Sequence, residues 1–274
     1  MSSFFDYMNN NQTLKFLFGL MEYGLNTDRL NILLPHFKSF EINNDVLTQE
    51  HIHHFKQVVM DNMVAQGYSR RDVMEMGNIL SICGIAAVSV QSEAVLRNDV
   101  DMSWAARYFD YIKNINDEDL QLLWSKILVQ EIKKRNSYYK RTLDVFYKAD
   151  KFEIDWFFEI TKYVFDKSCV PEFILSDNKF YPFNKFQTLI DAGFVNASLG
   201  SLSYPGEVIM HLTSVDIKIE IPKPPFGFSI YTLTDASTQL FDLQPVPASE
   251  EYISKLKEVI ERGNLAKVVA IERK

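Results

Sequence analysis

The sequence predicts an α+β protein that is mainly helical in its N-terminal and central region and continues into a small α/β domain. Apolar residues recur at spacings of three and four up to about residue 165, which is typical of helices with one buried face. Beyond Asp166, glycine, proline and β-branched residues become more frequent, and residues 215–221 alternate between apolar and polar like a half-buried strand. With 274 residues, 47% of them hydrophobic, the chain can bury a substantial core.

Helices account for most of the predicted N-terminal region. Thr48 and Ser69 each precede an apolar periodic segment, where their hydroxyls can accept hydrogen bonds from free backbone N–H groups. Residues 26–44 are mixed, and we expect Pro35 to break any helix there. The predicted helices cover residues 13–23, 48–66 and 69–96.

The most apolar run of the chain, residues 79–90, lies inside the last of these helices. It falls short of the roughly 20 residues that a membrane-spanning helix needs. We therefore predict a buried helix, with a membrane-associated hairpin as the minor alternative.

The central region contains the most regular pattern. An acidic segment at residues 116–119 precedes an apolar stripe, and basic residues follow at 133–135, so the charges at both ends suit the dipole of a helix. A preceding helix carries Trp104, Tyr108, Phe109 and Ile112 at helical spacing. Further helices are predicted at residues 137–147, 151–165, 183–190, 234–241 and 249–262, and strands at 215–221, 228–233 and 265–271.

Charge and cysteine usage restrict the class of protein. The net charge of -7 argues against general nucleic-acid binding, which depends on lysine and arginine displacing counterions. Cys83 and Cys169 stand among apolar neighbours and are predicted to be buried free thiols, as a reducing cytoplasm allows. The N-terminus has neither the basic nor the apolar segment of a signal peptide, so we expect a cytoplasmic protein.

The central region resembles a family of bacterial and prophage proteins known as domain of unknown function twenty-eight-oh-six. The resemblance covers roughly residues 100 to 165. It is carried by Trp104, Phe109-Asp110, Asp117-Glu118-Asp119, Gln121, Trp124, Ile127-Leu128, Glu131-Ile132, Ser137 and Thr142-Leu143. A Leu-x-x-Leu-Trp helix also resembles the abortive-infection alpha type of phage-defence protein. This second resemblance implies a role in phage defence or superinfection control.

A short pattern near the C-terminus resembles the end of a winged helix. It consists of a helix that closes at Gly193, a strand with Tyr231-Thr232-Leu233-Thr234, and Leu240 in a final helix. The resemblances to the uncharacterised family and to the winged helix divide the chain into four parts. These are a helical N-terminal region (1–98), a helical core (99–166), a winged-helix-like domain (167–244) and a C-terminal helix and strand (245–274).

A cluster of cations and tyrosines is the best candidate for contact with nucleic acid or another anion. Such a mixture can hold phosphates and stack bases. The same cations would, however, suit a solvated helix end, and we favour that interpretation. The cluster comprises Lys133, Lys134, Arg135, Tyr138, Tyr139, Lys140 and Arg141.

The winged-helix-like part has little of the charge that reading DNA requires. No arginine occurs between Arg141 and Arg262, and acidic residues outnumber lysines over that segment. Its predicted recognition helix offers Lys185 and Gln187 together with Asp191. Because DNA readers place several cations on phosphates, a protein contact is the favoured use of this domain.

We find no catalytic or metal-binding pattern. His51 and His54 could share a helix face, but no cysteine or carboxylate pair completes a metal shell. Trp104, Asp110, Gln121, Trp124, Glu131 and Thr142 are assigned to a structural core of the family pattern.

The sequence therefore predicts a non-enzymatic factor that uses no cofactor and binds a protein partner or a second copy of itself. A nucleic-acid-binding regulator that uses the winged helix and residues 133–141 is the alternative. An enzyme that gathers Glu131, Asp110 or the histidines in one pocket is the least favoured possibility.

Overall fold

The protein folds as two compact units, residues Met1–Lys140 (unit 1) and Arg141–Lys274 (unit 2). A computed structural model describes residues 2–25, 27–42, 46–92 and 101–274. Unit 1 is almost entirely helical, whereas unit 2 combines helices with two small antiparallel sheets. The predicted α+β class is therefore confirmed.

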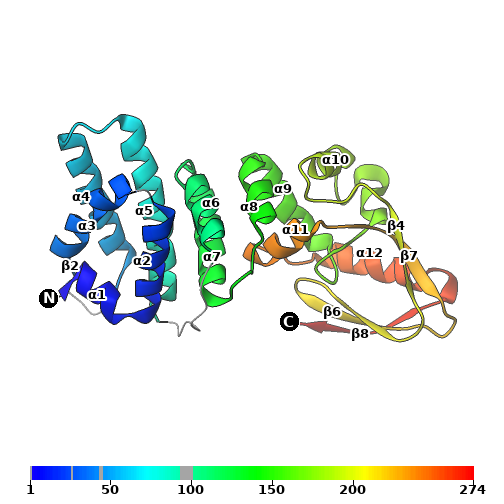
Figure 1. The fold of residues 1–274 in the computed structure, drawn as a ribbon. Helices are drawn as coiled ribbons and strands as arrows, with labels where there is room; N and C mark the ends of the chain where they lie inside the picture. The colour runs from blue at the N-terminus through cyan, green and yellow to red at the C-terminus, as the bar shows by residue number, and fades with distance from the viewer. Residues whose placement is uncertain (1, 26, 43–45, 93–100) are drawn as a thin grey trace. The chain divides into compact units, whose positions relative to one another are not determined.

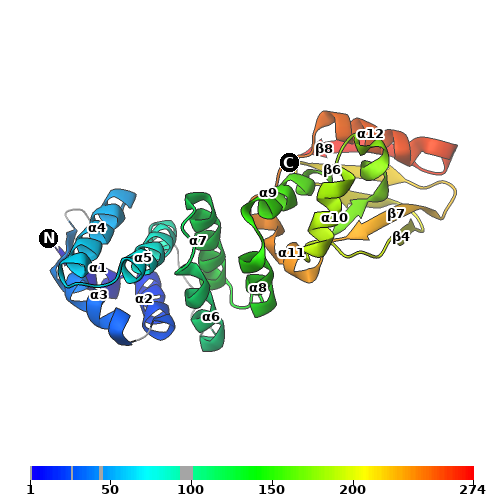
Figure 2. The same cartoon turned by 90° about the horizontal axis from the view of Figure 1, so that it is seen from above.

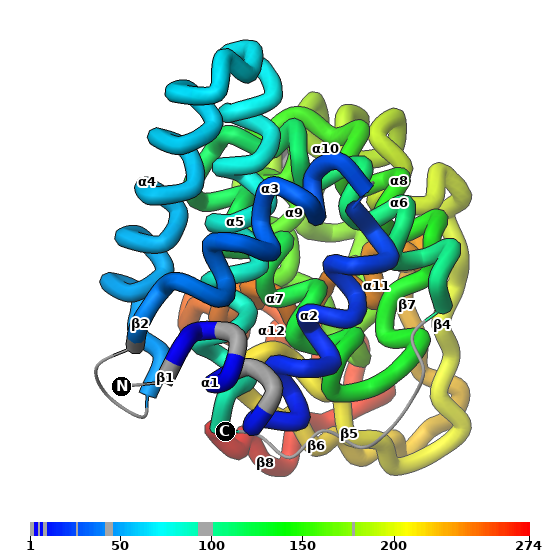
Figure 3. The backbone as a smooth tube through the Cα atoms, turned by 60° about the vertical axis from the view of Figure 1, so that its left-hand side comes forward, coloured from blue at the N-terminus to red at the C-terminus, as the bar shows by residue number. Residues whose placement is uncertain are grey.

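Unit 1 is a set of packed helices with one short pair of strands (Figure 1). Strands β1 and β2 pair over two residues each, and α1 lies beside them (Figure 3). The elements of this unit are β1 (Ser2–Ser3), α1 (Phe4–Asn10), α2 (Gln12–Gly24), α3 (Thr27–Ser39), β2 (Glu41–Ile42), α4 (Gln49–Ala65), α5 (Arg70–Val90), α6 (Met102–Ile112) and α7 (Glu118–Lys133).

Helix α5 is the centre of unit 1. It packs against α2, α4, α6 and α7, and its buried residues include Met76, Ile79, Ile82 and Ala86. Among the described residues, it is the helix that is long and apolar enough to cross a membrane, and 72% of its most apolar window is buried inside the protein. This helix thus supplies the apolar core around which unit 1 packs.

The ends of α4 and α5 follow the predicted capping. The Thr48 hydroxyl accepts a hydrogen bond from the His51 amide, and the Thr48 amide donates one to the His51 ring. Ser69 accepts from the amide of Asp72 at the start of α5. Helix α5 ends at Val90; the predicted continuation over residues 93–96 and the predicted division at 98/99 lie outside the described residues.

Pro35 does not break the helix in which it occurs, contrary to the prediction. Helix α3 is continuous through this residue and buries Ile32, Leu33 and Phe37. A proline in a helix interior loses one backbone hydrogen bond. Burial of this apolar face offsets that loss, because packing rather than propensity supplies most of the stability of helices in proteins.

Unit 2 begins with helices and continues into the two sheets (Figure 1). Its elements are α8 (Lys140–Lys148), α9 (Lys151–Ile160), η1 (Thr161–Tyr163), β3 (Cys169–Pro171), η2 (Glu172–Asn178), α10 (Phe183–Asp191), β4 (Gly200–Tyr204), β5 (Val208–His211), β6 (Val215–Glu220), β7 (Phe226–Thr232), α11 (Asp235–Leu240), η3 (Phe241–Leu243), α12 (Glu250–Glu261), η4 (Arg262–Asn264) and β8 (Lys267–Arg273).

The two sheets have the strand orders β3–β7–β4 and β5–β6–β8, with every pair antiparallel. Helix α12 packs on β8 (Figure 2). Its Leu256 and Ile260 are buried, as are Ile217 and Ile219 of β6. The chain leaves the first sheet after β4, forms β5 and β6 of the second, and returns to the first sheet as β7.

Several predicted boundaries in this part of the chain need correction. Helix α8 starts three residues later than predicted, because residues 134–139 form a turn around a buried carboxylate. Helix α9 ends at Ile160 and continues as the 3-10 turn η1 rather than reaching residue 165. Cys83 is buried as predicted, but Cys169 is only partly buried; both are free thiols.

Candidate functional site

The turn between α7 and α8 (residues 134–139, the α7–α8 turn) is organised by Glu131. This side chain is only 2% exposed, and its carboxylate accepts hydrogen bonds from the amides of Asn136 (2.7 Å) and Tyr138 (3.2 Å). Asn136 has a positive φ of 60°, a conformation that asparagine tolerates better than most residues. Burial raises the pKa of Glu131, and the backbone hydrogen bonds oppose that rise only in part. Glu131 therefore acts as a structural anchor for the turn.

The predicted cation–tyrosine cluster is divided by this turn. Tyr138 is buried at 4% exposure, so its ring is not available for stacking, whereas Tyr139 is 58% exposed. Lys140 forms an ion pair with Asp101 (3.3 Å) and contacts the Ser103 hydroxyl. Lys133 is partly buried at the end of α7. The exposed cations are Lys134 and Arg135 in unit 1 and Arg141, which starts unit 2.

The tryptophans of the family pattern lie in the core of unit 1. Trp104 stacks on Tyr108 with ring centroids 5.0 Å apart, and Trp124 packs against the same tyrosine. The Tyr108 hydroxyl donates to the Trp124 carbonyl at 2.8 Å. The Trp104 ring nitrogen is buried and has no hydrogen-bond partner in the part of the chain that the structure describes. These residues join α6 to α7.

Gln121 is part of a buried polar network that ties α5 to the start of α7. Its amide donates to Asn78 (3.1 Å) and to the carbonyl of Ile115 (2.8 Å). Asn78 in turn donates to the Lys113 carbonyl and to Asn116. Each of these bonds satisfies a polar group that would be costly to bury alone.

The two remaining residues of the family pattern, Asp110 and Thr142, have different surroundings. Asp110 is exposed and pairs with Lys113, the residue that follows the end of α6, as a solvated surface residue does. Thr142 is buried in α8 and donates its hydroxyl hydrogen to Gln239 of α11. The family-pattern residues are thus spread through both units and form no common site.

An aromatic cluster that the sequence did not predict occurs where α9 meets α10: Trp156 contacts both Phe152 and Lys185. Phe183 is also exposed, two residues before Lys185 on α10, and we call these four residues the α9–α10 surface. Phe152 and Phe183 are 46% and 54% exposed, and the Phe152 ring contacts that of Trp156 edge-on at 4.9 Å. The Lys185 ammonium lies 5.2 Å from the centre of the Trp156 ring. Its members come from positions up to 33 residues apart, so no local pattern connects them.

The charge of this surface is largely neutralised by Glu159. Its carboxylate contacts the ammonium of Lys185 at 2.8 Å and that of Lys162 at 3.5 Å. Burial by itself would raise the pKa of Glu159, but the bonds from the two lysines outweigh this effect and lower it. The surface therefore presents aromatic rings beside a paired lysine rather than a free cation.

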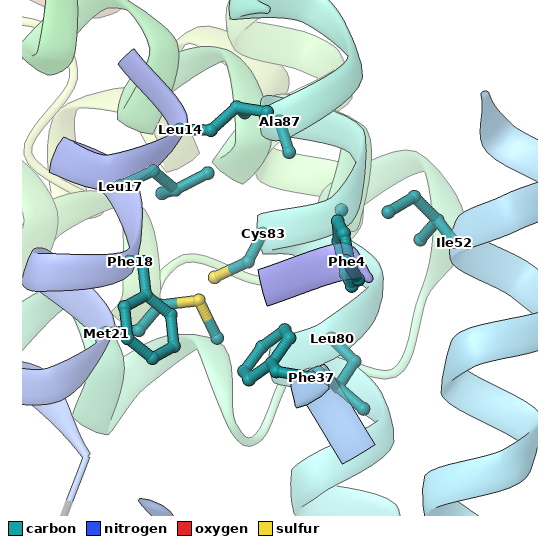
Figure 4. Close-up of a pocket in the computed structure, with 11 residues that line it drawn as sticks. Phe4, Leu14, Leu17, Phe18, Met21, Phe37, Ile52, Leu80, Cys83 and Ala87 are labelled. Carbon is teal, nitrogen blue, oxygen red and sulfur yellow. The ribbon is translucent and has the colours of Figure 1, made fainter. Parts of the chain in front are cut away.

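An apolar cavity occurs in unit 1 among α1, α2, α3, α4 and α5 (Figure 4). It measures about 30 Å³, well below the ~150 Å³ of a dry cavity that binds benzene. Its walls are hydrocarbon and aromatic side chains together with Cys83, whose thiol pKa is raised by burial. We interpret it as a packing defect.

His51 and His54 have structural contacts, and the described residues add no further metal ligands to them. His51 caps α4, while the ring of His54 packs against Phe40 at 5.4 Å. Within residues 2–25, 27–42, 46–92 and 101–274, no three His, Cys, Asp or Glu side chains come together in a way that could hold a metal ion.

Residues 69–163 match the model of a protein family of unknown function, DUF2806. The match includes all the residues on which the sequence resemblance rested and extends it toward the N-terminus through α5. No curated protein and no solved structure matches the chain.

Proposed function

We propose that this chain is a non-enzymatic interaction factor that binds a protein through the α9–α10 surface. We further propose that it acts in the bacterial cytoplasm, in phage defence or superinfection control. This role relies on the resemblance of the sequence to the abortive-infection alpha type. The partner is another protein or a second copy of this chain.

We also propose a winged-helix-like fold for this part of the chain, which the sequence predicted at residues 167–244 and which we now begin at α9. Helix α9, strand β3, η2, α10 and strands β4 and β7 occur in the order helix, strand, helix, helix, strand, strand, and the sheet order is β3–β7–β4. This order supports a helix-turn-helix pair with a two-stranded wing, in which α10 takes the place of the recognition helix. Strands β5 and β6 are then an insertion in the wing.

The observation that carries the proposal is the chemistry of α10. A helix that reads DNA needs lysine or arginine side chains for phosphates and base edges. Lys185, the lysine of α10, is already paired with Glu159. The exposed residues of α10 are Phe183, Asn184, Gln187 and Asp191. Exposed aromatic rings with few charges are typical of the centre of a protein interface.

The test is a tagged purification of the full chain from bacterial lysate at low and high salt. We expect a discrete homo-oligomer or a stoichiometric protein that withstands high salt. Phe152→Ala/Phe183→Ala should release it, whereas Leu122→Ala, which removes an exposed leucine of unit 1 (45%), should not. A monomer that binds only nucleic acid, with a raised 260/280 nm absorbance ratio that high salt abolishes, would contradict the proposal.

The alternative function, a nucleic-acid-binding regulator, draws support from the exposed Lys134, Arg135 and Arg141. Lys134→Glu/Arg135→Glu is the informative variant, because Lys140 also pairs with Asp101 and its replacement would disturb α6. Salt-dependent DNA binding that this double variant abolishes would favour the alternative.

A further inference from the structure

A groove runs between α3 and the turn that joins α4 to α5. It consists of two hollows of about 220 and 200 Å³, which share Ile32 and Tyr68 in their walls. Each is smaller than the roughly 300–1,000 Å³ typical of ligand-binding pockets, so an occupant of that size would span both. Unlike the cavity of Figure 4, this groove has polar walls and is large enough to hold a side chain.

The two hollows differ in chemistry. One is lined by two acidic residues, Asp28 and Asp72, together with Tyr68, Met63 and Met76. The Asp72 carboxylate also accepts a hydrogen bond from the Ser69 hydroxyl. The other has the side chains of His36, Asn31, Asn62 and Gln66. The first hollow thus combines negative charge with an aromatic ring, and the second offers hydrogen-bonding groups.

Positive charge near the first hollow is paired with Glu75. Arg29 is part of its wall, but its guanidinium pairs with Glu75, which is only 4% exposed. Arg71 binds the same carboxylate at 2.8 Å. Asp28 is exposed and has no ion-pair or hydrogen-bond partner among the described residues. Its charge is therefore available to a ligand.

The length of the groove fits an extended chain. Its α3 wall reaches from Asp28 to His36, a rise of about 12 Å at 1.5 Å per residue. An extended peptide advances about 3.3 Å per residue, so three or four residues would fill this length. Gln66 donates one amide hydrogen to the Asn62 side-chain oxygen at 2.8 Å. The remaining amide groups of these two residues, and the amide of Asn31, can bond the N–H and C=O groups of such a segment.

We propose that this groove binds an extended segment of a partner protein and holds a lysine or arginine side chain of that segment between Asp28, Asp72 and the Tyr68 ring. Carboxylates attract the cation, and an aromatic ring adds a cation–π contact. The site belongs to unit 1 and deepens the proposed protein-binding function. It does not depend on the α9–α10 surface.

Fluorescence anisotropy of the full chain with two labelled pentapeptides tests the proposal. Both peptides are glycine except at the centre, which is arginine in one and glutamine in the other. We expect the arginine peptide to bind more tightly, with an affinity that falls as salt is added. Equal binding of the two peptides, or no binding of either, would overturn the proposal.

Variants then place the binding in the groove. Asp28→Asn should weaken arginine-peptide binding about tenfold. Asp61→Asn, a matched change on an exposed residue of α4 outside the groove, should leave it unchanged. Tyr68→Phe keeps the ring and should bind like the wild type, whereas Tyr68→Leu should bind more weakly. Equal affinity of Asp28→Asn and Asp61→Asn would refute the groove even if the α9–α10 surface still bound its own partner.

Discussion

The α7–α8 turn and the α9–α10 surface use similar residue types in opposite ways. At the turn, Glu131 is buried and bonds backbone amides, so its carboxylate is directed inward. On the surface, Glu159 pairs with lysines, and aromatic rings beside it remain exposed. The residues with the most recognisable sequence pattern are therefore those that build the fold, whereas the proposed contact lies where no pattern stands out.

Replacing Glu131 is expected to have the largest effect. Glu131→Ala leaves buried amides without an acceptor, and we expect a loss of about 3 kcal/mol or more of unfolding free energy. Glu131→Gln keeps one carbonyl oxygen and should lose less. Urea denaturation measures both, with Glu118→Ala, an exposed change on the same helix, as the control. A small effect of Glu131→Ala would mean that the turn does not depend on this carboxylate.

The raised pKa of Glu131 also predicts a pH dependence of stability. The folded protein holds the Glu131 proton more tightly than the unfolded chain does, since burial penalises the charged form. The stabilising contribution is therefore complete below the ordinary pKa of 4.5 and is lost as the pH rises through the raised value. The difference in stability between the wild type and Glu131→Gln, measured by thermal unfolding, should therefore be smaller at neutral pH than in acid.

The buried network around Gln121 should give the next largest effect. Gln121→Leu removes the donor for the Ile115 carbonyl and for Asn78, and we expect a loss of about 2 kcal/mol. Gln57→Leu, an exposed glutamine on α4, is the control in the same denaturation experiment. A loss no greater than that of the control would show that water replaces the missing donor.

A smaller change is expected when Glu159 is neutralised. Glu159→Gln should cost within about 1 kcal/mol, because both of its ion pairs are partly solvated. The lowered pKa means that this stabilisation is present above the ordinary pKa of 4.5 and is lost as the pH falls through the lowered value. The same variant should raise DNA affinity at low salt, measured by anisotropy, because Lys162 and Lys185 lose their partner. Unchanged DNA affinity would show that Glu159 is not what keeps DNA from this surface.

The smallest effect on stability is expected from Lys134→Glu/Arg135→Glu. Both residues are exposed, so the unfolding free energy should change by no more than about 0.5 kcal/mol. Urea denaturation measures this change. A larger loss of unfolding free energy would mean that these cations stabilise the α7–α8 turn.

The sequence predicted the long helices well because they carry their own caps and periodic apolar faces, as Thr48 and Ser69 illustrate. Strands β3, β4 and β5 were missed because each has at most five residues, too few for a clear alternation, and their pairing depends on partners distant in the chain. The same limit applies to the sites. Local spacing suggested the cluster at 133–141, but only the fold showed that Tyr138 is buried and that Phe152 and Phe183 are exposed.

The segment that matches the family and the compact units of the fold do not share their borders. Residues 69–163 begin at the cap of α5 and end with η1, and the division at 140/141 falls inside this span. A fragment restricted to these residues would contain α5 without α2 and α4, which cover its apolar side. Such a fragment should be insoluble when expressed alone. In this chain, the segment that matches the family model therefore relies on α2 and α4, which lie before it in the sequence, to shield the apolar side of α5.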